Sequence, residues 1–513
     1  MSRVPSVRVP LLRPFQIQRP FAQTIARAAF VAALCWGCSE PAQEAAQFTH
    51  SAVVQDHLAK LDQRLSQSAE NSDSQAQAVD PEQVGGLVAM LATSSGGARE
   101  LPLTDVQALG DGALAPLMVI ATRTDKPQQE RLAALELMEA LGSLRATEQL
   151  LKICESSPEA WMRAQSAWRL GNLRADWTVS RLLYRLKYEV DEETRVWIAR
   201  TLGLCGNYAG QDALYNTQNQ GSTPELQQSA QQQIQDIVQA SGVEDAQVLW
   251  NSWYVADPEG KILRKDPSDR FLREFWRLVS DLSGEHFQLR GVDDARYILS
   301  NLGAWATPYL CQALHDKDVY VRVHVAQCLE RMRGRATGAG PHLLEALTDE
   351  SLAPAAATAL GEISFPLAEP KLRELLLALT SPHELRVACA SALGRIALPK
   401  SLVALEQVLA ADSEPYDLRQ RAAISLCQMG RGEQAVPFLH AAMANVRVDR
   451  FGAEVAIGFW LGQLEGPAAA SALEQWNALQ PTLGLIATSE QAETRINSRH
   501  ALLSQVLESL LNP

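Results

Sequence analysis

The stretch TRVWIARTLGLCG, residues 194–206, decides the fold because its spacing of residue types returns along most of the chain. Arg195 is followed four residues later by Ala199, and then by Leu202 and Gly203. This spacing places the apolar residues on one face of a helix, which the glycine is expected to close. One such helix cannot bury its apolar stripe alone, so the pattern predicts that several of these helices pack together.

The same frame of arginine, alanine, leucine and glycine occurs at several other places. Full copies begin at Arg163 and Arg386, and copies without the glycine begin at Arg322 and Arg419. Weaker copies lack the arginine and end at the Leu-Gly pairs 109–110, 141–142, 302–303, 360–361 and 461–462. A drifting period of about 30 residues, with no alternating strand pattern, predicts an all-α protein, an α-solenoid of two-helix repeats.

These pieces resemble HEAT repeats, in the short bacterial form known from phycobilin lyases. The motif of that family has a turn with Asp, a helix with Arg and Ala-x-x-Leu-Gly, and a following helix that begins Ala-x-Pro-x-Leu. The chain supplies the first part at 191–203 and 318–329, and the second at 115–117, 306–310 and 436–439. The resemblance implies stacked two-helix HEAT-like repeats over about three quarters of the chain and indicates little about function.

The charge of the chain argues against nucleic acid as a partner. The 513 residues carry 46 basic and 59 acidic side chains, for a net charge of −13. All of the basic residues of the first 38 stand without an acidic neighbour, so removal of that segment would make the remainder more acidic still. Such a surface repels phosphate backbones, and we expect no nucleic-acid binding.

The first 38 residues have the pattern of a signal peptide, with an arginine-rich lead followed by the apolar run 28–37. That run is short for a membrane span, which favours a cleaved signal. Gly37-Cys38 at its end resembles a bacterial lipobox, although Cys35 and Trp36 depart from the usual residues. We therefore expect lipidation of Cys38, with an ordinary signal cut or an uncleaved anchor as the alternatives. The implied location is the cell envelope, with the protein exported and facing the periplasm or the cell surface.

The remaining chain divides by composition. Residues 39–81 are polar and predict a tether with a possible short helix, and residues 82–206 and 295–480 contain the HEAT-like repeats. In between, residues 207–294 lose the frame and are either degenerate repeats or an insertion. This region contains Trp250 and Trp253, which either bind a ligand or fill a change of curvature. Residues 481–513 predict a C-terminal capping helix.

No motif in the sequence predicts catalysis. The histidines form no His-x-x-x-His pair, and neither a phosphate-binding loop nor a Gly-x-Ser-x-Gly elbow occurs. The glycine-rich run 334–340 is interpreted as an inter-helix loop. We expect no catalytic residue, no metal and no cofactor. Six cysteines beyond the signal lack metal-type spacing and fall mostly on apolar helix positions, with their redox state left open: Cys154, Cys205, Cys311, Cys328, Cys389 and Cys427.

The repeated arginine is interpreted as structural, tying neighbouring turns together through an aspartate. Positions two and five residues after it are mostly polar and share one helical face, which predicts an outward surface. On two successive copies these positions hold Trp168 and Trp197, with Arg200 beside them and Trp161 earlier in the first helix. The second helices of HEAT arrays line the concave surface, so these residues resemble a protein-binding patch. The alternative is that the tryptophans pack against neighbouring helices.

The sequence therefore predicts a non-catalytic scaffold or adaptor that binds another protein at the bacterial cell envelope, held there by an N-terminal lipid. Two alternatives come from other classes: a HEAT-like enzyme related to the phycobilin lyases, and a small-ligand or peptide receptor that uses Trp250, Trp253 and Tyr254. A bound chromophore or metal would favour an enzyme or a receptor, whereas a co-purifying polypeptide would favour the scaffold. The identity of the partner is not encoded in any motif.

Overall fold

A computed structural model describes residues 52–70, 79–241, 254–256, 262–264, 267–283, 289–443 and 450–464, with residues 470 and 474. Two compact units divide the chain, one covering Phe48–Ala368 and the other the described residues from Glu369 onwards. The predicted signal with Cys38, the pair Trp250 and Trp253, and the predicted capping helix lie outside the described residues.

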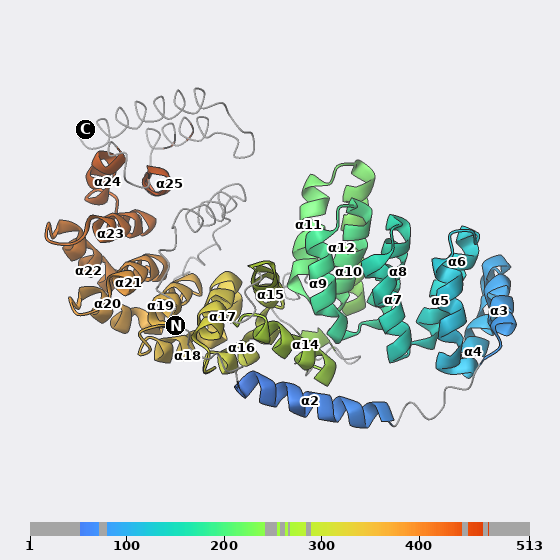
Figure 1. The fold of residues 1–513 in the computed structure, drawn as a ribbon. Helices are drawn as coiled ribbons and strands as arrows, with labels where there is room; N and C mark the ends of the chain where they lie inside the picture. Colours follow the sequence, from blue (N-terminus) through green and yellow to red (C-terminus); the bar gives the residue numbers. More distant parts are fainter. Residues whose placement is uncertain are drawn as a thin grey trace, which may run out of the picture. The chain divides into compact units, whose positions relative to one another are not determined.

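The first unit begins with a helical array (Figure 1). Its elements are α2 (Ala52–Glu70), α3 (Pro81–Thr93), η2 (Gly96–Arg99), α4 (Glu100–Leu109), η3 (Gly110–Ala113), α5 (Leu114–Thr122), α6 (Gln128–Leu141), α7 (Leu144–Ser156), α8 (Ala160–Leu173), η4 (Asp176–Thr178), α9 (Val179–Tyr188), α10 (Glu192–Leu204), α11 (Tyr208–Gln220) and α12 (Pro224–Ser241).

The unit continues through a small hairpin into a second run of helices. These elements are β1 (Tyr254–Ala256), β2 (Ile262–Arg264), α14 (Asp269–Ser280), α15 (Leu289–Asn301), η5 (Ala304–Ala306), α16 (Thr307–Ala313), α17 (Val319–Met332), η6 (Arg333–Ala339), α18 (Gly340–Ala346), α19 (Ala353–Glu362) and η7 (Pro366–Ala368). The two strands pair antiparallel, with Val255 opposite Leu263.

The second unit repeats the same helix-pair arrangement. Its elements are α20 (Glu369–Leu377), α21 (His383–Ile396), α22 (Pro399–Ala410), α23 (Tyr416–Gln428), α24 (Ala435–Met443) and α25 (Arg450–Leu461).

The helices that carry the repeated motif pack on one another. In the first unit α6, α8 and α10 form one series and α15, α17 and α19 another, and in the second unit α21, α23 and α25 form a third. The intervening helices pack against the motif helices within each unit, as α7 does against α8 and α22 against α23. Apolar motif residues such as Ala167, Leu202 and Leu393 are almost fully buried between the layers. The predicted all-α solenoid of two-helix repeats is thereby confirmed.

The motif glycine has a different role from the one expected. Helix α8 continues past Gly171 to Leu173, and α21 continues past Gly394 to Ile396, so the glycine does not end the helix. A Cβ atom on Gly394 would lie 2.5 Å from the Cβ atom of Ser425 in the next motif helix. The glycine therefore permits close approach of successive motif helices. The expectation that it closes the helix is wrong for these copies.

A hydrogen bond accompanies this close approach. Thr201 of α10 donates its hydroxyl to the carbonyl oxygen of Ala167 in α8 at 2.5 Å, and Ser425 of α23 donates to the carbonyl of Ala390 in α21 at 2.9 Å. The hydroxyl occupies the same motif position in both pairs, six residues after the arginine. Small residues and a buried side-chain donor together fix how one repeat sits on the next.

The motif arginine makes an ion pair that we call the repeat clasp, formed with a carboxylate 26 to 28 residues later in the chain. Arg163 contacts Glu189 through two hydrogen bonds of 2.8 Å, and Arg386 contacts Glu414 at 2.8 and 2.6 Å. Arg322 pairs with Asp349 at 3.0 Å. The structural interpretation of the arginine is confirmed, although its partner is more often glutamate than aspartate.

The clasp also identifies a motif copy that the sequence pattern misplaced. Arg131 of α6 donates to the carbonyl of Ala121 and pairs with Glu159, just as Arg386 donates to the carbonyl of Leu376 and pairs with Glu414. Its frame continues with Leu135 and Met138, both fully buried, instead of alanine and leucine. The copy in α6 therefore begins at Arg131 and was obscured by these substitutions.

The region 207–294 contains a further helix pair, followed by the small hairpin and α14. Helices α11 and α12 pack on α10, with Ala230 and Ile237 of α12 buried, so they extend the first series by one degenerate repeat. The strands β1 and β2 follow, and then α15 packs against α9 and α17. Helix α12 is thus the last helix of the first series, and the next series begins with α15, which packs against α9.

Helix α2 is the helix expected within the polar segment 39–81. It packs along α14, where Val54 and Leu61 are buried and the ring of His57 stacks on Trp276 at 4.2 Å. Arg64 pairs with Asp269 at 3.0 Å across the same contact. This part of the segment is therefore attached to the first unit.

One run among the described residues, Gly96–Thr122, is long and apolar enough to cross a membrane by length and composition. The structure divides it into η2, α4, η3 and α5, with a break at Gly110 where φ is 59°. Helices α3 and α6 pack against both α4 and α5. The run therefore belongs to the packed beginning of the array.

Candidate functional site

The predicted tryptophan pair lies on neighbouring motif helices, α8 and α10. The ring centroids of Trp168 and Trp197 are 6.3 Å apart and tilted by 60°, and both side chains are half-buried. Arg200 lies over the ring of Trp197 at 6.0 Å, and the exposed Asn172 lies beside it. We call these four residues the α8–α10 face. The predicted proximity of the two tryptophans is confirmed, and their role in binding stays a prediction.

Arg200 is a cation that the fold leaves weakly satisfied. Its Nη1 reaches the carbonyl oxygen of Trp168 and its Nη2 reaches Asn172, each at 3.5 Å, and its buried Nε has no hydrogen-bond partner. Within the described ranges it forms no ion pair, and burial lowers its pKa. A guanidinium held in this way is able to accept a carboxylate from outside the chain.

The neighbouring cation has different surroundings. The side chain of Arg169 is only 4% exposed, and it lies 3.8 Å from Glu136 and 3.7 Å from Glu139 of α6. Glu136 also accepts hydrogen bonds from Arg99, and Glu139 accepts one from Asn172. Arg169 therefore has carboxylates within ion-pair distance, whereas Arg200 has only the more distant attraction of Asp236 and Glu139.

Trp161 does not join the α8–α10 face. Its ring lies 4.8 Å from the guanidinium of Arg131, beside the Arg131–Glu159 clasp. Partial burial and a cation–π contact at the start of α8 explain this tryptophan structurally. Of the six candidate binding residues, the structure brings together Trp168, Trp197 and Arg200, while Trp161 lies against the clasp and Trp250 and Trp253 lie outside the described residues.

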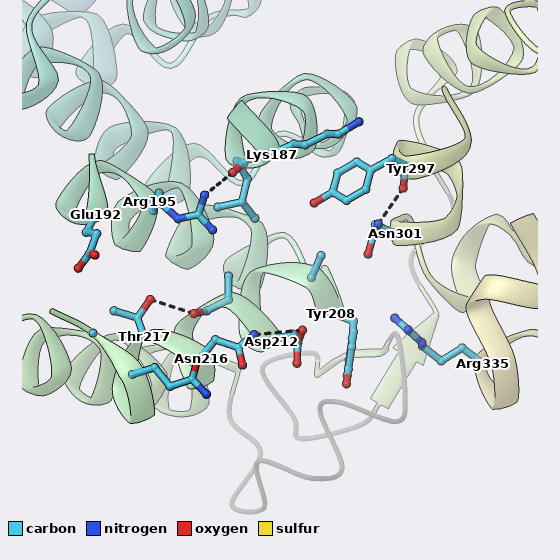
Figure 2. A pocket seen from close by; sticks show the side chains of 15 residues that line it. Lys187, Glu192, Arg195, Tyr208, Asp212, Asn216, Thr217, Tyr297, Asn301 and Arg335 are labelled. Atoms are coloured by element: carbon cyan, nitrogen blue, oxygen red, sulfur yellow. Dashed lines mark hydrogen bonds between the residues drawn. The ribbon is translucent and has the colours of Figure 1, made fainter. Parts of the chain in front are cut away.

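A second feature is a cleft that the sequence did not predict (Figure 2). It encloses about 530 Å³ between α9, α10 and α11 on one side and α15 and η6 on the other, all within the first unit. Figure 2 shows Arg195 and Arg335 approaching this space from opposite walls, with the hydroxyl of Tyr297 pointing into it. No sequence signal marked this site, because its walls come from segments far apart in the chain.

The cations of the cleft differ in how they are paired. Lys187 forms an ion pair with Asp294 at 2.6 Å. Arg195 donates from Nη1 to the carbonyl oxygens of Leu186 and Glu189, at 2.8 and 3.1 Å. Arg335 lies over the ring of Tyr208 at 4.1 Å, and its buried Nη1 has no partner among the described atoms.

The described residues contain no cluster of three or more His, Cys, Asp and Glu side chains that could hold a metal ion. Burial raises the pKa of the Cys154, Cys389 and Cys427 thiols to about 12, and the pKa of Cys311 and Cys328 to about 11. These five cysteines act as small apolar residues in the core, as the sequence predicted.

Comparison with known proteins supports the repeat architecture. Residues 340–427 match the family of HEAT repeats. No curated protein sequence matches the chain. Among solved structures, human deoxyhypusine hydroxylase is 20% identical over 64% of this chain and 99% of its own, with a TM-score of 0.22. Importin beta is 13% identical over 83% of this chain and 67% of its own, with a TM-score of 0.29. The karyopherin Kap121p, bound to the extreme C-terminus of the protein phosphatase Cdc14p, is 10% identical over 89% of this chain and 57% of its own, also with a TM-score of 0.29.

Proposed function

We propose that this protein is a non-catalytic scaffold that binds another protein through the α8–α10 face. The observation that carries the proposal is the pair Trp168 and Trp197 beside Arg200, a half-buried cation that forms no ion pair within the described chain. Tryptophan and arginine are the residues most often found at the energetic centre of protein interfaces. The HEAT repeats at 340–427 are consistent with a scaffold, since solenoids present extended surfaces to partners.

The chemistry of the face defines the kind of partner that it fits. An aspartate or glutamate of the partner would satisfy Arg200, and an adjacent apolar side chain would cover the two indole rings. We propose an acidic segment with a neighbouring large apolar residue as the docking element.

The proposal extends to location. The arginine-rich lead and Gly37-Cys38 support export and attachment of a lipid at Cys38, which would place the scaffold at the bacterial cell envelope. Mass analysis of the mature N-terminus of the full-length chain, beside a Cys38→Ala variant, tests this part. An unprocessed N-terminus in the producing organism would contradict it.

The binding role is tested with the double variant Trp168→Ala and Trp197→Ala and with Arg200→Gln. A pull-down from membranes under mild detergent should recover one stoichiometric protein partner with the wild-type chain and none with the double variant. Arg200→Gln should weaken capture by about tenfold, since a charge-assisted hydrogen bond is lost.

Tyr184→Ala provides a matched control, because Tyr184 is an exposed aromatic residue on α9. It should capture the partner as the wild type does. Retention of helical content and melting temperature by the double variant separates a binding role from a packing role. Undiminished capture by the double variant, or a large loss of its stability, would refute the proposed face. A co-purifying chromophore in place of a polypeptide would favour the enzyme alternative.

A further inference from the structure

The cleft between α11 and α15 lies where the first series of motif helices ends and the second begins. Helix α12 follows α10 in the first series, whereas α15 packs against α9. One wall is the face of α11 that carries Tyr208, Asp212 and Asn216, and the other is formed by α15 and η6. Figure 2 shows the side chains of both walls directed into the space between them.

The repeat clasp explains why Arg195 is available in this cleft. Every clasp joins a motif arginine to a carboxylate 26 to 28 residues later, and Glu159 is the residue directly before α8. Counted from Arg195, these positions hold Gly221, Ser222 and Thr223. Arg195 is therefore a motif arginine with no carboxylate at its clasp positions; Arg419 also lacks one there, but it pairs with Asp412 instead.

Arg335 supplies a second guanidinium from the opposite wall. Its Nε donates to the carbonyl of Met332 at 3.3 Å, while its Nη1 is buried without a hydrogen-bond partner among the described residues. An unsatisfied buried donor destabilises the protein unless something bound there accepts its hydrogen bond. The stacking of Arg335 on Tyr208 holds the guanidinium plane in a fixed orientation.

The rest of the lining indicates what else a ligand should carry. Asp212 and Asn216 line the cleft and contact each other at 3.5 Å, and one carboxylate oxygen of Glu192 accepts hydrogen bonds from Ser222 at the edge. The hydroxyl of Tyr297 points into the same space (Figure 2). These groups match a ligand that has hydrogen-bond donors in addition to its negative charge.

We propose that this cleft binds a small carboxylic acid that carries amino or hydroxyl groups, with a carboxylate at Arg195 and its other polar groups toward the opposite wall, where Arg335 lies. The ligand carboxylate takes the place of the acidic side chain that completes the clasp in other repeats. A fork of guanidinium donors favours the planar, bidentate carboxylate. The site is separate from the α8–α10 face, and neither proposal depends on the other.

The test is isothermal titration calorimetry of the purified chain with glutamate, malate, succinate and inorganic phosphate. Glutamate or malate should bind, and succinate, which lacks the amino or hydroxyl group, should bind more weakly. Binding of phosphate without any of the carboxylates would overturn the carboxylate assignment. No binding of any of the four probes would overturn the site itself.

The decisive variant is Thr223→Glu, which places a carboxylate at the clasp position directly before α12. It should pair with Arg195, raise the melting temperature of the free protein and weaken acid binding by about tenfold or more. Thr223→Gln is the matched control and should bind the acid as the wild type does, since it adds no charge.

Arg335→Gln provides an independent check, because Thr223→Glu tests only Arg195. This variant should also weaken binding by about tenfold, through loss of one charged donor. If both Thr223→Glu and Arg335→Gln bind the acid with unchanged affinity, the ligand does not occupy this cleft and the proposal fails. Capture of the protein partner should be unaffected in all three variants.

Discussion

Glu189 is the most completely enclosed charge among the clasps. Its side chain is fully buried, and it accepts hydrogen bonds from Arg163 at 2.8 Å, from Arg185 at 2.6 Å and from the backbone N–H groups of Val190 and Asp191 at 3.0 Å. Burial alone would raise the pKa of Glu189, but the hydrogen bonds from these partners lower it to about 2. One carboxylate thus compensates two arginines and closes the loop before α10.

Glu189→Gln should destabilise the first unit by about 3–5 kcal/mol, because two buried or partly buried guanidinium groups lose their counter-charge. Urea unfolding monitored by circular dichroism measures this. Glu155→Gln is the control, since the pair that Glu155 forms with Arg181 is partly exposed and its loss should cost about 1 kcal/mol or less. Equal losses for the two variants would contradict the role assigned to Glu189.

The lowered pKa of Glu189 also predicts an acid-dependent contribution to stability. The folded-state pKa of about 2 lies below the ordinary value of 4.5, so the contribution is complete above pH 4.5 and is lost as the pH falls through 2. The wild-type chain should lose stability over this range more steeply than Glu189→Gln. Parallel curves for the two proteins would show that the carboxylate does not titrate as described.

At the scale of the helices, the repeat is held by contacts that the sequence pattern only partly reveals. The arginine, alanine and leucine positions were readable because their spacing is local and follows the helical period. The role of the glycine could not be predicted, because it depends on Thr201 or Ser425 in a helix 30 or 31 residues away. The copy at Arg131 was missed because it has Leu135 and Met138 where the frame has alanine and leucine.

Gly394→Ala should destabilise the second unit by about 1–3 kcal/mol, because the added methyl group meets Ser425 Cβ at 2.5 Å and its Cα at 2.9 Å. Gly86→Ala in α3 is the control. Nothing lies within 4 Å of a Cβ atom there, and the better helix propensity of alanine should stabilise the chain by up to about 1 kcal/mol. Thermal unfolding of each variant and of the wild type measures both changes in stability. A neutral Gly394→Ala would show that close approach is not required.

At the scale of the whole molecule, the repeat of about 30 residues predicted the class of fold. The sequence could not predict that the first series ends at α12 and that α15 packs against α9. Helix α12 replaces the arginine and alanine of the frame with glutamines, so its membership of the series is visible only from its packing on α10. The cleft arises from contact between α9 and α15, which no local spacing encodes. For the α8–α10 face the spacing correctly paired Trp168 with Trp197, but it could not show that Arg200 forms no ion pair among the described residues.

The cysteines allow a prediction that covers both units. Iodoacetamide at pH 8 should modify Cys205, which is half-buried, and leave the other five described thiols unmodified until the protein is unfolded. Their raised pKa values keep them protonated, and the thiolate is the reactive form. Mass spectrometry of native and denatured samples counts the modified sites. Rapid labelling of Cys154 or Cys389 in the native chain would contradict their burial.

The missing clasp at Arg195 has a mechanical consequence. When the first unit is pulled along its length, the joints between α6 and α8 and between α8 and α10 resist through an ion pair as well as through packed apolar surface. The joint between α10 and α12 has no such ion pair and is held by packing and by the hydrogen bonds from Ser222 to Glu192, so we expect it to yield at the lowest force of the three. A ligand that occupies the cleft and pairs with Arg195 would then strengthen this joint. Its binding would raise the force that is needed to extend the first unit.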